Sequence, residues 1–394
     1  MSALYRRYVA GQAVSILGDQ VWYVALSWSA VRIASPSAAG AILAVSAVPR
    51  LAFLLFGGAI VDRHDSRRLM IGSDLLRCVV ALAAAAVAGW GPSIALLVAV
   101  ALVFGAADAI FLPAAATVPP RLLPPAQLSR GAAINSLAAR LALTLGAPLG
   151  GVLVAVGGLP VACVVNAATF LLSVLALRGL PPMRTARPVR EPVTGALRSG
   201  LRYLRRHRLL RTILMVSLLT NLGFVGPMNI GLALVSDERG WGSAGIGVLL
   251  AGFGGGAVVA SLAMVRVRWR GRVGVAMAAG IAVQGAAVSA VAVAGQQWAA
   301  VSATVVVGLT SGLVAVLTSA LTQARTDDAF RGRVGSVSSF ANLGITPIAM
   351  AVMGVAADRF GTTPAFAGSA ALELAAAALC LAVADLRNAR LPQS

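Results

Sequence analysis

Four ionisable side chains interrupt long apolar runs of this sequence: Asp19, Arg50, Asp108 and Arg140. A charge inside an apolar helix is costly, so such residues pair with one another or take part in function. Two chemistries fit two acids and two bases. Either the four form static ion pairs that order a bundle, or an aspartate takes up and releases a proton. We favour proton uptake by Asp19, and after it by Asp108, because Asp19 stands in the polar break SILGDQVWY.

The remaining polar residues inside apolar runs have simpler interpretations. Asp74 and Arg77 are three residues apart, the spacing at which helical side chains meet. We expect them to form a local ion pair near a helix end, or to support the charged loop before it. Glu373 is expected to contact a neighbouring helix. The cysteines and histidines lack the spacing of metal ligands or of a nucleophile with its base, so we predict no enzyme, metal site or cofactor.

The elements that must position these charges are membrane-spanning helices. The 394 residues are 59% hydrophobic and 11% charged, with a mean hydropathy of +0.87, which leaves too few polar residues to cover a soluble protein. A bilayer core requires about 20 residues of helix. Twelve apolar segments approach or exceed this length, so we predict an all-α polytopic membrane protein. The predicted spans are 8–31, 38–61, 69–89, 94–117, 129–156, 160–178, 209–235, 243–265, 273–294, 298–322, 332–356 and 363–385.

The net charge of +19 reflects membrane topology rather than nucleic-acid binding. The great majority of the 32 basic residues, all of them Arg, fall in the termini and in connections after even-numbered spans. This asymmetry fits the positive-inside rule and predicts that both termini are cytoplasmic. Counted from the cytoplasmic ends, the four charged residues described first then lie roughly 14–17 Å deep, near the bilayer midplane.

The longest connection divides the chain into two halves of six spans. It covers residues 179–208 and contains four prolines, which are followed by GALRSGLRYLRRHRLLR at 195–211. We expect a loop followed by a basic helix on the cytoplasmic surface, between an N-terminal bundle (1–178) and a C-terminal bundle (209–394). The halves are similar, since RGAAINSLAARLALTLGAP at 130–148 matches RGRVGSVSSFANLGITP at 331–347. Parallel six-helix repeats are a transporter architecture.

The charged connection between the second and third spans carries the most specific motif. Its sequence, GGAIVDRHDSRR at 57–68, resembles the signature loop of the major facilitator superfamily, Gly-x-x-x-Asp-Arg-x-Gly-Arg-Arg. Gly58, Asp62 and Arg63 match directly, Arg67 takes the final basic position, and Asp65 stands where the motif has Gly. The segments FLPAAATVPPRLLP (111–124), NAATFLLS (166–173) and LRYLRRHRLLR (201–211) further resemble the branch of enterobactin exporters and macrolide efflux proteins.

This resemblance implies that the charged loop is a conformational latch. The residues that would form it are Gly58, Asp62, Arg63, Arg67 and Arg68. Gly58 permits close helix approach, and the Asp62 carboxylate is suited to the N-terminus of the third span, near Leu69. The alternative is that the loop only supplies positive-inside charge.

A glycine-rich segment in the fifth predicted span partly resembles the antiporter motif of the family. In LGAPLGG at 145–151, the motif positions are Gly146, Pro148, Gly150 and Gly151, with Ala147 intruding. Gly150 and Gly151 are expected to let this helix approach the C-terminal half. The match favours export over import.

We therefore predict a secondary transporter working by alternating access, with two bundles rocking around a central cavity. The resemblance implies a proton-coupled exporter of a drug, macrolide or siderophore in the bacterial cytoplasmic membrane, acting as a monomer on a small molecule, with protons and membrane lipid as its other partners. Candidate cavity residues are Trp22, Tyr23, Asn221, Asn229 and Asn342. The alternatives are a proton-coupled importer or facilitator, a lipid flippase, and a non-transporting membrane sensor on the same fold.

Overall fold

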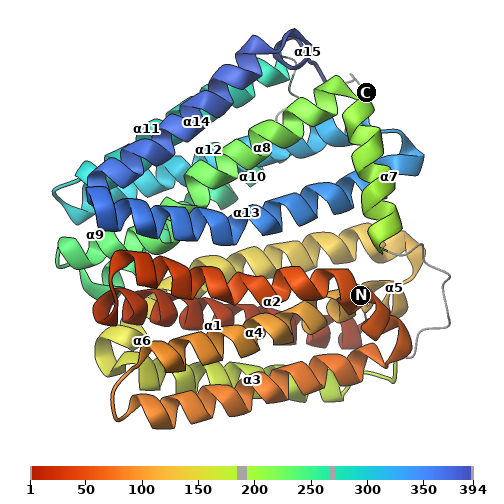
Figure 1. Ribbon diagram of the computed structural model, residues 1–394. Helices are drawn as coiled ribbons and strands as arrows, with labels where there is room; N and C mark the ends of the chain where they lie inside the picture. Colours follow the sequence, from red (N-terminus) through yellow and green to blue (C-terminus); the bar gives the residue numbers. More distant parts are fainter. Residues whose placement is uncertain (1, 184–192, 267–268, 270, 392–394) are drawn as a thin grey trace. The chain divides into compact units, whose positions relative to one another are not determined.

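The structure is a computed structural model that describes residues 2–183, 193–266, 269 and 271–391. The side chains of residues 52–63, 129, 193–194, 196 and 265–266 are outside this description. The described residues form helices and short connections, without a strand (Figure 1). Helices are expected here because a bilayer core offers no water to backbone groups, which must then bond within their own segment.

Helix boundaries follow the polar breaks in the sequence. The N-terminal elements are α1 (Ala3–Ile33), α2 (Pro36–Arg63), α3 (Ser66–Ala88), α4 (Ile94–Ala116), α5 (Pro119–Leu122), η1 (Pro125–Gln127) and α6 (Leu128–Arg178). The others are α7 (Val193–Arg206), α8 (Arg208–Gly226), η2 (Pro227–Gly231), α9 (Leu232–Glu238), α10 (Gly242–Arg266), α11 (Val273–Val293), α12 (Gln297–Arg325), η3 (Asp328–Phe330), α13 (Arg331–Phe360), α14 (Thr362–Ala382) and α15 (Ala384–Arg387). Of the residues predicted as the central linker, 184–192 lie outside the description.

The long helix α6 comprises two membrane passes. Gly158 has φ 63° and ψ −161°, a backbone conformation that glycine adopts without penalty. A Cβ added to Gly131 would meet Tyr5, and one added to Gly150 would meet Val21, so the first leg runs parallel to α1. The same construction at Gly11 meets Ser173 and at Gly18 meets Thr169, so the second leg runs antiparallel. The chain therefore reverses at the predicted break after residue 156.

The helices are consistent with twelve spans. In the described residues, nine helical segments are long and apolar enough to cross a bilayer, and one of them contains both legs of α6. Of the remaining helices, α1 has 31 residues and α2 has 28, which exceeds the length needed for a pass. The second leg of α6, α1 and α2 complete the set.

The chain divides into two compact units. Unit 1 comprises Met1–Ala34, Ile42–Arg190 and Gly240–Val248, and unit 2 comprises Ser35–Ala41, Glu191–Arg239 and Leu249–Ser394. Within unit 1, α1, α3, α4 and α6 pack side by side (Figure 1). A buried apolar cluster around Tyr8, Met70 and Phe111 joins their ends.

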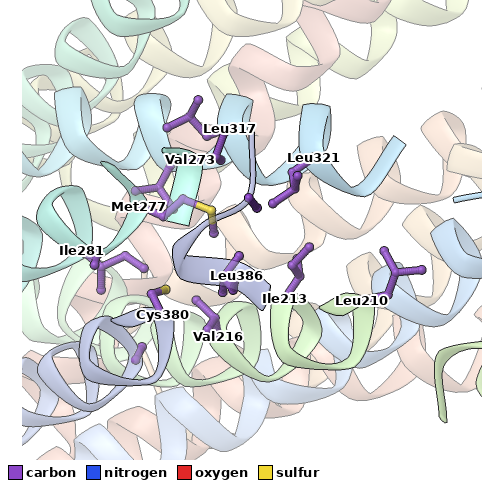
Figure 2. Close-up of a cluster of buried hydrophobic side chains, with 14 of the residues drawn as sticks. Leu210, Ile213, Val216, Val273, Met277, Ile281, Leu317, Leu321, Cys380 and Leu386 are labelled. Carbon is purple, nitrogen blue, oxygen red and sulfur yellow. The ribbon is translucent and has the colours of Figure 1, made fainter. Parts of the chain in front are cut away.

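Unit 2 is centred on a buried cluster of hydrophobic side chains from α7, α8, α11, α12, α13, α14 and α15, part of which Figure 2 shows. Met277, Leu317 and Cys380 meet there. Helix α7 belongs to this unit, and its Tyr203 stacks on Phe330 with ring centroids 4.3 Å apart. The Tyr203 hydroxyl donates to Asp327 Oδ2 at 3.0 Å. The apolar side of this basic helix is therefore packed against protein.

Candidate functional site

A buried charge cluster in unit 1 is organised around Arg77 of α3. One terminal nitrogen of Arg77 lies 2.6 Å from Asp108 Oδ1 of α4 and 3.4 Å from Asp19 Oδ1 of α1. The other donates to Asp74, one helical turn earlier. Asp108 also accepts from Arg50 of α2. Helices α1, α3 and α4 thus meet at Arg77, and α2 joins them through the pair of Arg50 and Asp108.

The side chains of the cluster differ in how much of their surface is exposed. Arg77 is 1% exposed and Asp74 is fully buried, whereas Asp108 is 17% and Asp19 34% exposed. The Arg77 guanidinium also lies over two aromatic rings, 4.4 Å from the centroid of Phe170 and 4.9 Å from that of Phe111. These rings shield the arginine and attract its charge. Asp19 is therefore the acid with the longest ion pair and the greatest access.

The charges of the cluster do not balance when every group is ionised. Its carboxylates belong to Asp19, Asp74 and Asp108, and its guanidiniums to Arg50 and Arg77. One carboxylate is in excess, and one added proton would make the cluster neutral. Since uncompensated charge is expensive away from water, this arrangement is suited to binding a proton.

The structure modifies the predicted set of deep charges. It brings Asp19, Asp108 and Arg50 together, whereas the Arg140 side chain is exposed on α6 and contributes to none of these four ion pairs. The predicted local contact between Asp74 and Arg77 exists. Arg77 has a wider role than that interpretation gave it, because its other nitrogen reaches two further helices. Spacing along one helix reveals only the partner on that helix.

The predicted latch is only partly within the described side chains. Gly58, Asp62 and Arg63 lie in α2, and their side chains are outside the description. The N-cap of α3 is Asp65, whose carboxylate accepts the Arg68 backbone N–H at 3.2 Å. The position predicted for Asp62, at the start of the third span, is thus occupied by the residue that departs from the family motif.

Asp65 also connects α3 to the segment that follows α6. Its second carboxylate oxygen accepts the Met183 backbone N–H at 2.8 Å. Arg67 donates to the carbonyls of Leu177 and Arg178 at the C-terminus of α6, where cations are favoured. Arg121 donates to the Met183 carbonyl at 2.6 Å. The start of α3, helix α5 and the end of α6 with the residues after it are thus tied together by side chains that bind backbone.

The glycine motif of α6 packs against two helices. A Cβ at Gly146 would lie 2.8 Å from the Leu17 carbonyl oxygen, and one at Gly150 would lie 2.9 Å from Val21 Cα, so both glycines face α1. A Cβ at Gly151 would lie 2.7 Å from the Ser243 carbonyl oxygen in the part of α10 that belongs to unit 1. The approach predicted for the Gly150–Gly151 pair thus involves α1 at Gly150 and α10 at Gly151. Pro148 lies at the same contact, beside Gly247.

A cavity of about 710 Å³ lies within unit 2. Its polar lining is mostly neutral hydroxyl and amide groups, with Arg331 as the charged residue among the described lining side chains. The polar lining residues on α8 and α12 include Ser217, Thr220, Asn221, Ser311, Thr318, Ser319, Thr322 and Gln323. Apolar surface and a few polar groups in this volume are typical of a small-molecule site.

The five residues predicted to line a cavity are divided between the two units. Asn221 and Asn342 line the unit 2 cavity and contact each other, with Asn221 Nδ2 donating to Asn342 Oδ1 at 2.9 Å. Asn229 is not among the lining residues and donates to the Val225 carbonyl. Trp22 is buried in unit 1 against Phe104 at 5.1 Å, and Tyr23 lies beside it on α1. The two asparagines are the predicted residues on this cavity.

The helical architecture is that of a multi-pass membrane protein. The sequence profile of the Major Facilitator Superfamily matches residues 8–345, so the chain belongs to this family. This family is a family of transporters. The resemblance carried by the loop at 57–68 is thereby confirmed at the level of the superfamily.

Relatives of known sequence include an efflux pump. The multidrug efflux pump Tap of Mycobacterium tuberculosis is 28% identical over 397 residues, covering 94% of this chain and 90% of Tap. An uncharacterized MFS-type transporter of Bacillus subtilis, YfiS, is 28% identical over 217 residues, covering 53% of this chain and 51% of YfiS.

Solved structures of transporters share the fold. The nucleoside transporter NupG matches with a TM-score of 0.76 and 13% identity, over 97% of this chain and 99% of NupG. A structure from work on proton dependent oligopeptide transporters matches with a TM-score of 0.74 and 15% identity, over 98% and 99% of the two chains. At this identity the likeness concerns the fold.

Proposed function

We propose that this chain is a proton-coupled exporter of small amphipathic or hydrophobic molecules that works by alternating access. The observation that carries the proposal is the excess carboxylate in the cluster of Asp19, Asp74 and Asp108 around Arg77 and Arg50. A transporter driven by protons needs a group that exchanges one without a large electrostatic penalty. The cluster has such a group in Asp19, which is the most exposed and least closely paired of its acids.

Loading and release of the proton follow from the Arg77 contacts. With Asp19 ionised, Arg77 is shared among three carboxylates. With Asp19 protonated, Arg77 keeps its closer contacts to Asp74 and Asp108, and α1 loses its charged attachment to α3. Protonation thus changes how firmly α1 is held to its neighbours, which gives a physical link between proton binding and helix movement.

The direction of transport and the substrate class are supported by different observations. Tap is named as a multidrug efflux pump, and its 28% identity extends over nearly the whole chain, which favours outward transport of drug-like compounds. The mostly neutral, hydroxyl- and amide-lined cavity of unit 2 suits an uncharged or weakly charged molecule. A macrolide or siderophore with many oxygen atoms belongs to that class.

The proposed location is the bacterial cytoplasmic membrane, with both termini in the cytoplasm and the protein acting as a monomer. The arginine-rich connections support this orientation. In this arrangement, 1–178 and 209–394 are the two moving bundles, and 179–208 is the cytoplasmic linker. Attaching a reporter that fluoresces only in the cytoplasm to either terminus tests the orientation.

The function is tested by measuring accumulation of antibiotics, dyes and siderophores in efflux-deficient cells. We expect wild type to lower accumulation of at least one compound, and a protonophore or Asp19→Asn to abolish this effect. Asp385→Asn is the matched control, because Asp385 is half exposed and pairs loosely with Arg208 at 3.9 Å. All variants are compared at equal membrane abundance.

The alternatives predict different results. Raised accumulation in wild-type cells would indicate import, and an effect insensitive to the protonophore would indicate a facilitator. Lipid scrambling in protein-containing liposomes, with no response to soluble compounds, would indicate a flippase. Equal accumulation in cells with and without the protein for the whole panel and for lipid would contradict export of drug-like compounds.

A further inference from the structure

A second acid is buried in unit 2, away from the cluster around Arg77. Glu373 of α14 is fully buried, and its Oε1 accepts from Gln284 Nε2 of α11 at 3.2 Å. Two glycines lie against the Glu373 side chain. A Cβ on Gly223 of α8 would lie 2.9 Å from Glu373 Cγ, and one on Gly285 of α11 would lie 3.2 Å from Glu373 Cβ. The three helices meet tightly around this side chain.

No charged group of the described residues compensates Glu373. Helix α11 and η2 contain none, and α14 itself contains only Glu373, with Cys380 as its other titratable residue. The charged residues of the other packed elements lie at helix ends: Arg208 and Arg211 on α8, Arg331, Arg333, Asp358 and Arg359 on α13, and Asp385 and Arg387 on α15. An ionised Glu373 would therefore be a buried charge without a counterion, which is strongly unfavourable.

Two atoms at this contact lack a hydrogen-bond partner. They are Glu373 Oε2 and Gln284 Oε1, both buried. Both are acceptors when Glu373 is ionised, so neither can satisfy the other. A proton on Glu373 Oε2 turns that atom into a donor, and Gln284 Oε1 is the acceptor available on the partner side chain. The acid and the amide then form a cyclic pair with two hydrogen bonds.

Gln284 connects this pair to the cavity of unit 2. Its side chain is 2% exposed, and it is one of the residues that line the 710 Å³ cavity, whereas Glu373 is not among them. We propose that Glu373 is a proton-binding site of unit 2, which holds its proton in a cyclic pair with Gln284 and exchanges it with the cavity through Gln284.

The test uses the small number of glutamates in the chain. These are Glu191, Glu238 and Glu373, so in the E191Q/E238Q background Glu373 is the sole glutamate. The protein is synthesised in a cell-free system with glutamate carrying ¹³C in its side-chain carboxyl group, inserted into liposomes, and studied by infrared spectroscopy at neutral pH. Labelled against unlabelled difference spectra then report on Glu373 alone.

We expect the isotope-shifted band of a protonated carboxyl group at neutral pH. Transfer to D₂O should shift that band within minutes, because the proton exchanges through the cavity. Gln284→Leu should move the band toward that of an acid without hydrogen bonds and slow its exchange. Gln284→Asn, which keeps the amide, is the milder variant if Gln284→Leu does not insert.

Two outcomes would overturn the inference. Labelled carboxylate stretching bands in place of the acid band would mean that Glu373 is ionised. An acid band that does not shift in D₂O over hours would mean a sealed structural proton rather than an exchanging site. Because neither measurement uses a transported compound, the result is independent of the proposed export activity.

Discussion

Arg77 and Asp108 make the closest described contact between α3 and α4 in the charge cluster, with 2.6 Å between a guanidinium nitrogen and Oδ1. The same nitrogen of Arg77 reaches Asp19 at 3.4 Å. Arg77 therefore holds the three acids of the cluster together, and Asp19 is the acid whose ion pair is most easily broken by a proton. Separate substitutions should distinguish these two roles.

Removing Arg77 should destabilise the protein. Arg77→Ala leaves Asp74 buried without a cation and Asp108 with Arg50 only. Breaking a buried ion pair in this way costs about 3–5 kcal/mol. The measurement is the midpoint of thermal aggregation in detergent, followed by size-exclusion chromatography. Arg68→Ala is the control, since its side chain is exposed, and an equal loss in both variants would contradict a special role for Arg77.

Asp19→Asn should keep the fold and remove proton coupling. The substitution mimics the protonated acid, and Arg77 retains Asp74 and Asp108. Thermal stability should change by less than about 1 kcal/mol, as is usual when a partly exposed pair is lost. Substrate should still bind, while uphill export driven by an imposed pH gradient in liposomes should fall to background. Export that follows the gradient as in wild type would exclude Asp19 as the coupling group.

Asp65→Ala should loosen the end of unit 1 at which α3 begins. It removes the N-cap of α3, worth about 1 kcal/mol, and the hydrogen bond to the Met183 N–H. Limited proteolysis should cut the connection after α6 faster than in wild type. Asp65→Asn keeps an acceptor for the cap and should have a smaller effect.

Asp62→Asn tests the latch separately from that cap. The protein is expected to insert and remain folded but to transport more slowly, because Asp62 stands at the junction of two long helices. Initial rates of export at matched abundance provide the measurement. A folded Asp62→Asn protein with wild-type rates would assign the loop to topology alone.

Gly151→Val should block close packing between α6 and the start of α10. A Cβ there would stand 2.7 Å from the Ser243 carbonyl oxygen. The crowding should lower the free energy of unfolding by about 1–3 kcal/mol or stop transport. Gly255→Val on α10 is the matched control, because nothing lies within 4 Å of its Cβ position. Similar transport by both variants would show that the contact is not needed.

The amino-acid sequence by itself determined the helical membrane class, the break between the legs of α6 and the superfamily. Each depends on local information: an apolar run long enough for a bilayer, glycine and proline at 157–160, and a short charged motif between two runs. It also identified Asp19, Arg50 and Asp108 as costly charges, because burial cost follows from the apolar surroundings along the chain.

Only the tertiary structure decided which of these charges meet. The hub is Arg77, whose helical periodicity points to Asp74 alone, and its approach to Asp19 and Asp108 depends on how α1, α3 and α4 are rotated about their axes. Rotation is set by packing such as the contact of α1 with Gly146 and Gly150. The partnership of Glu373 with Gln284, 89 residues apart, arises in the same way, since no local pattern encodes which faces of two distant helices adjoin.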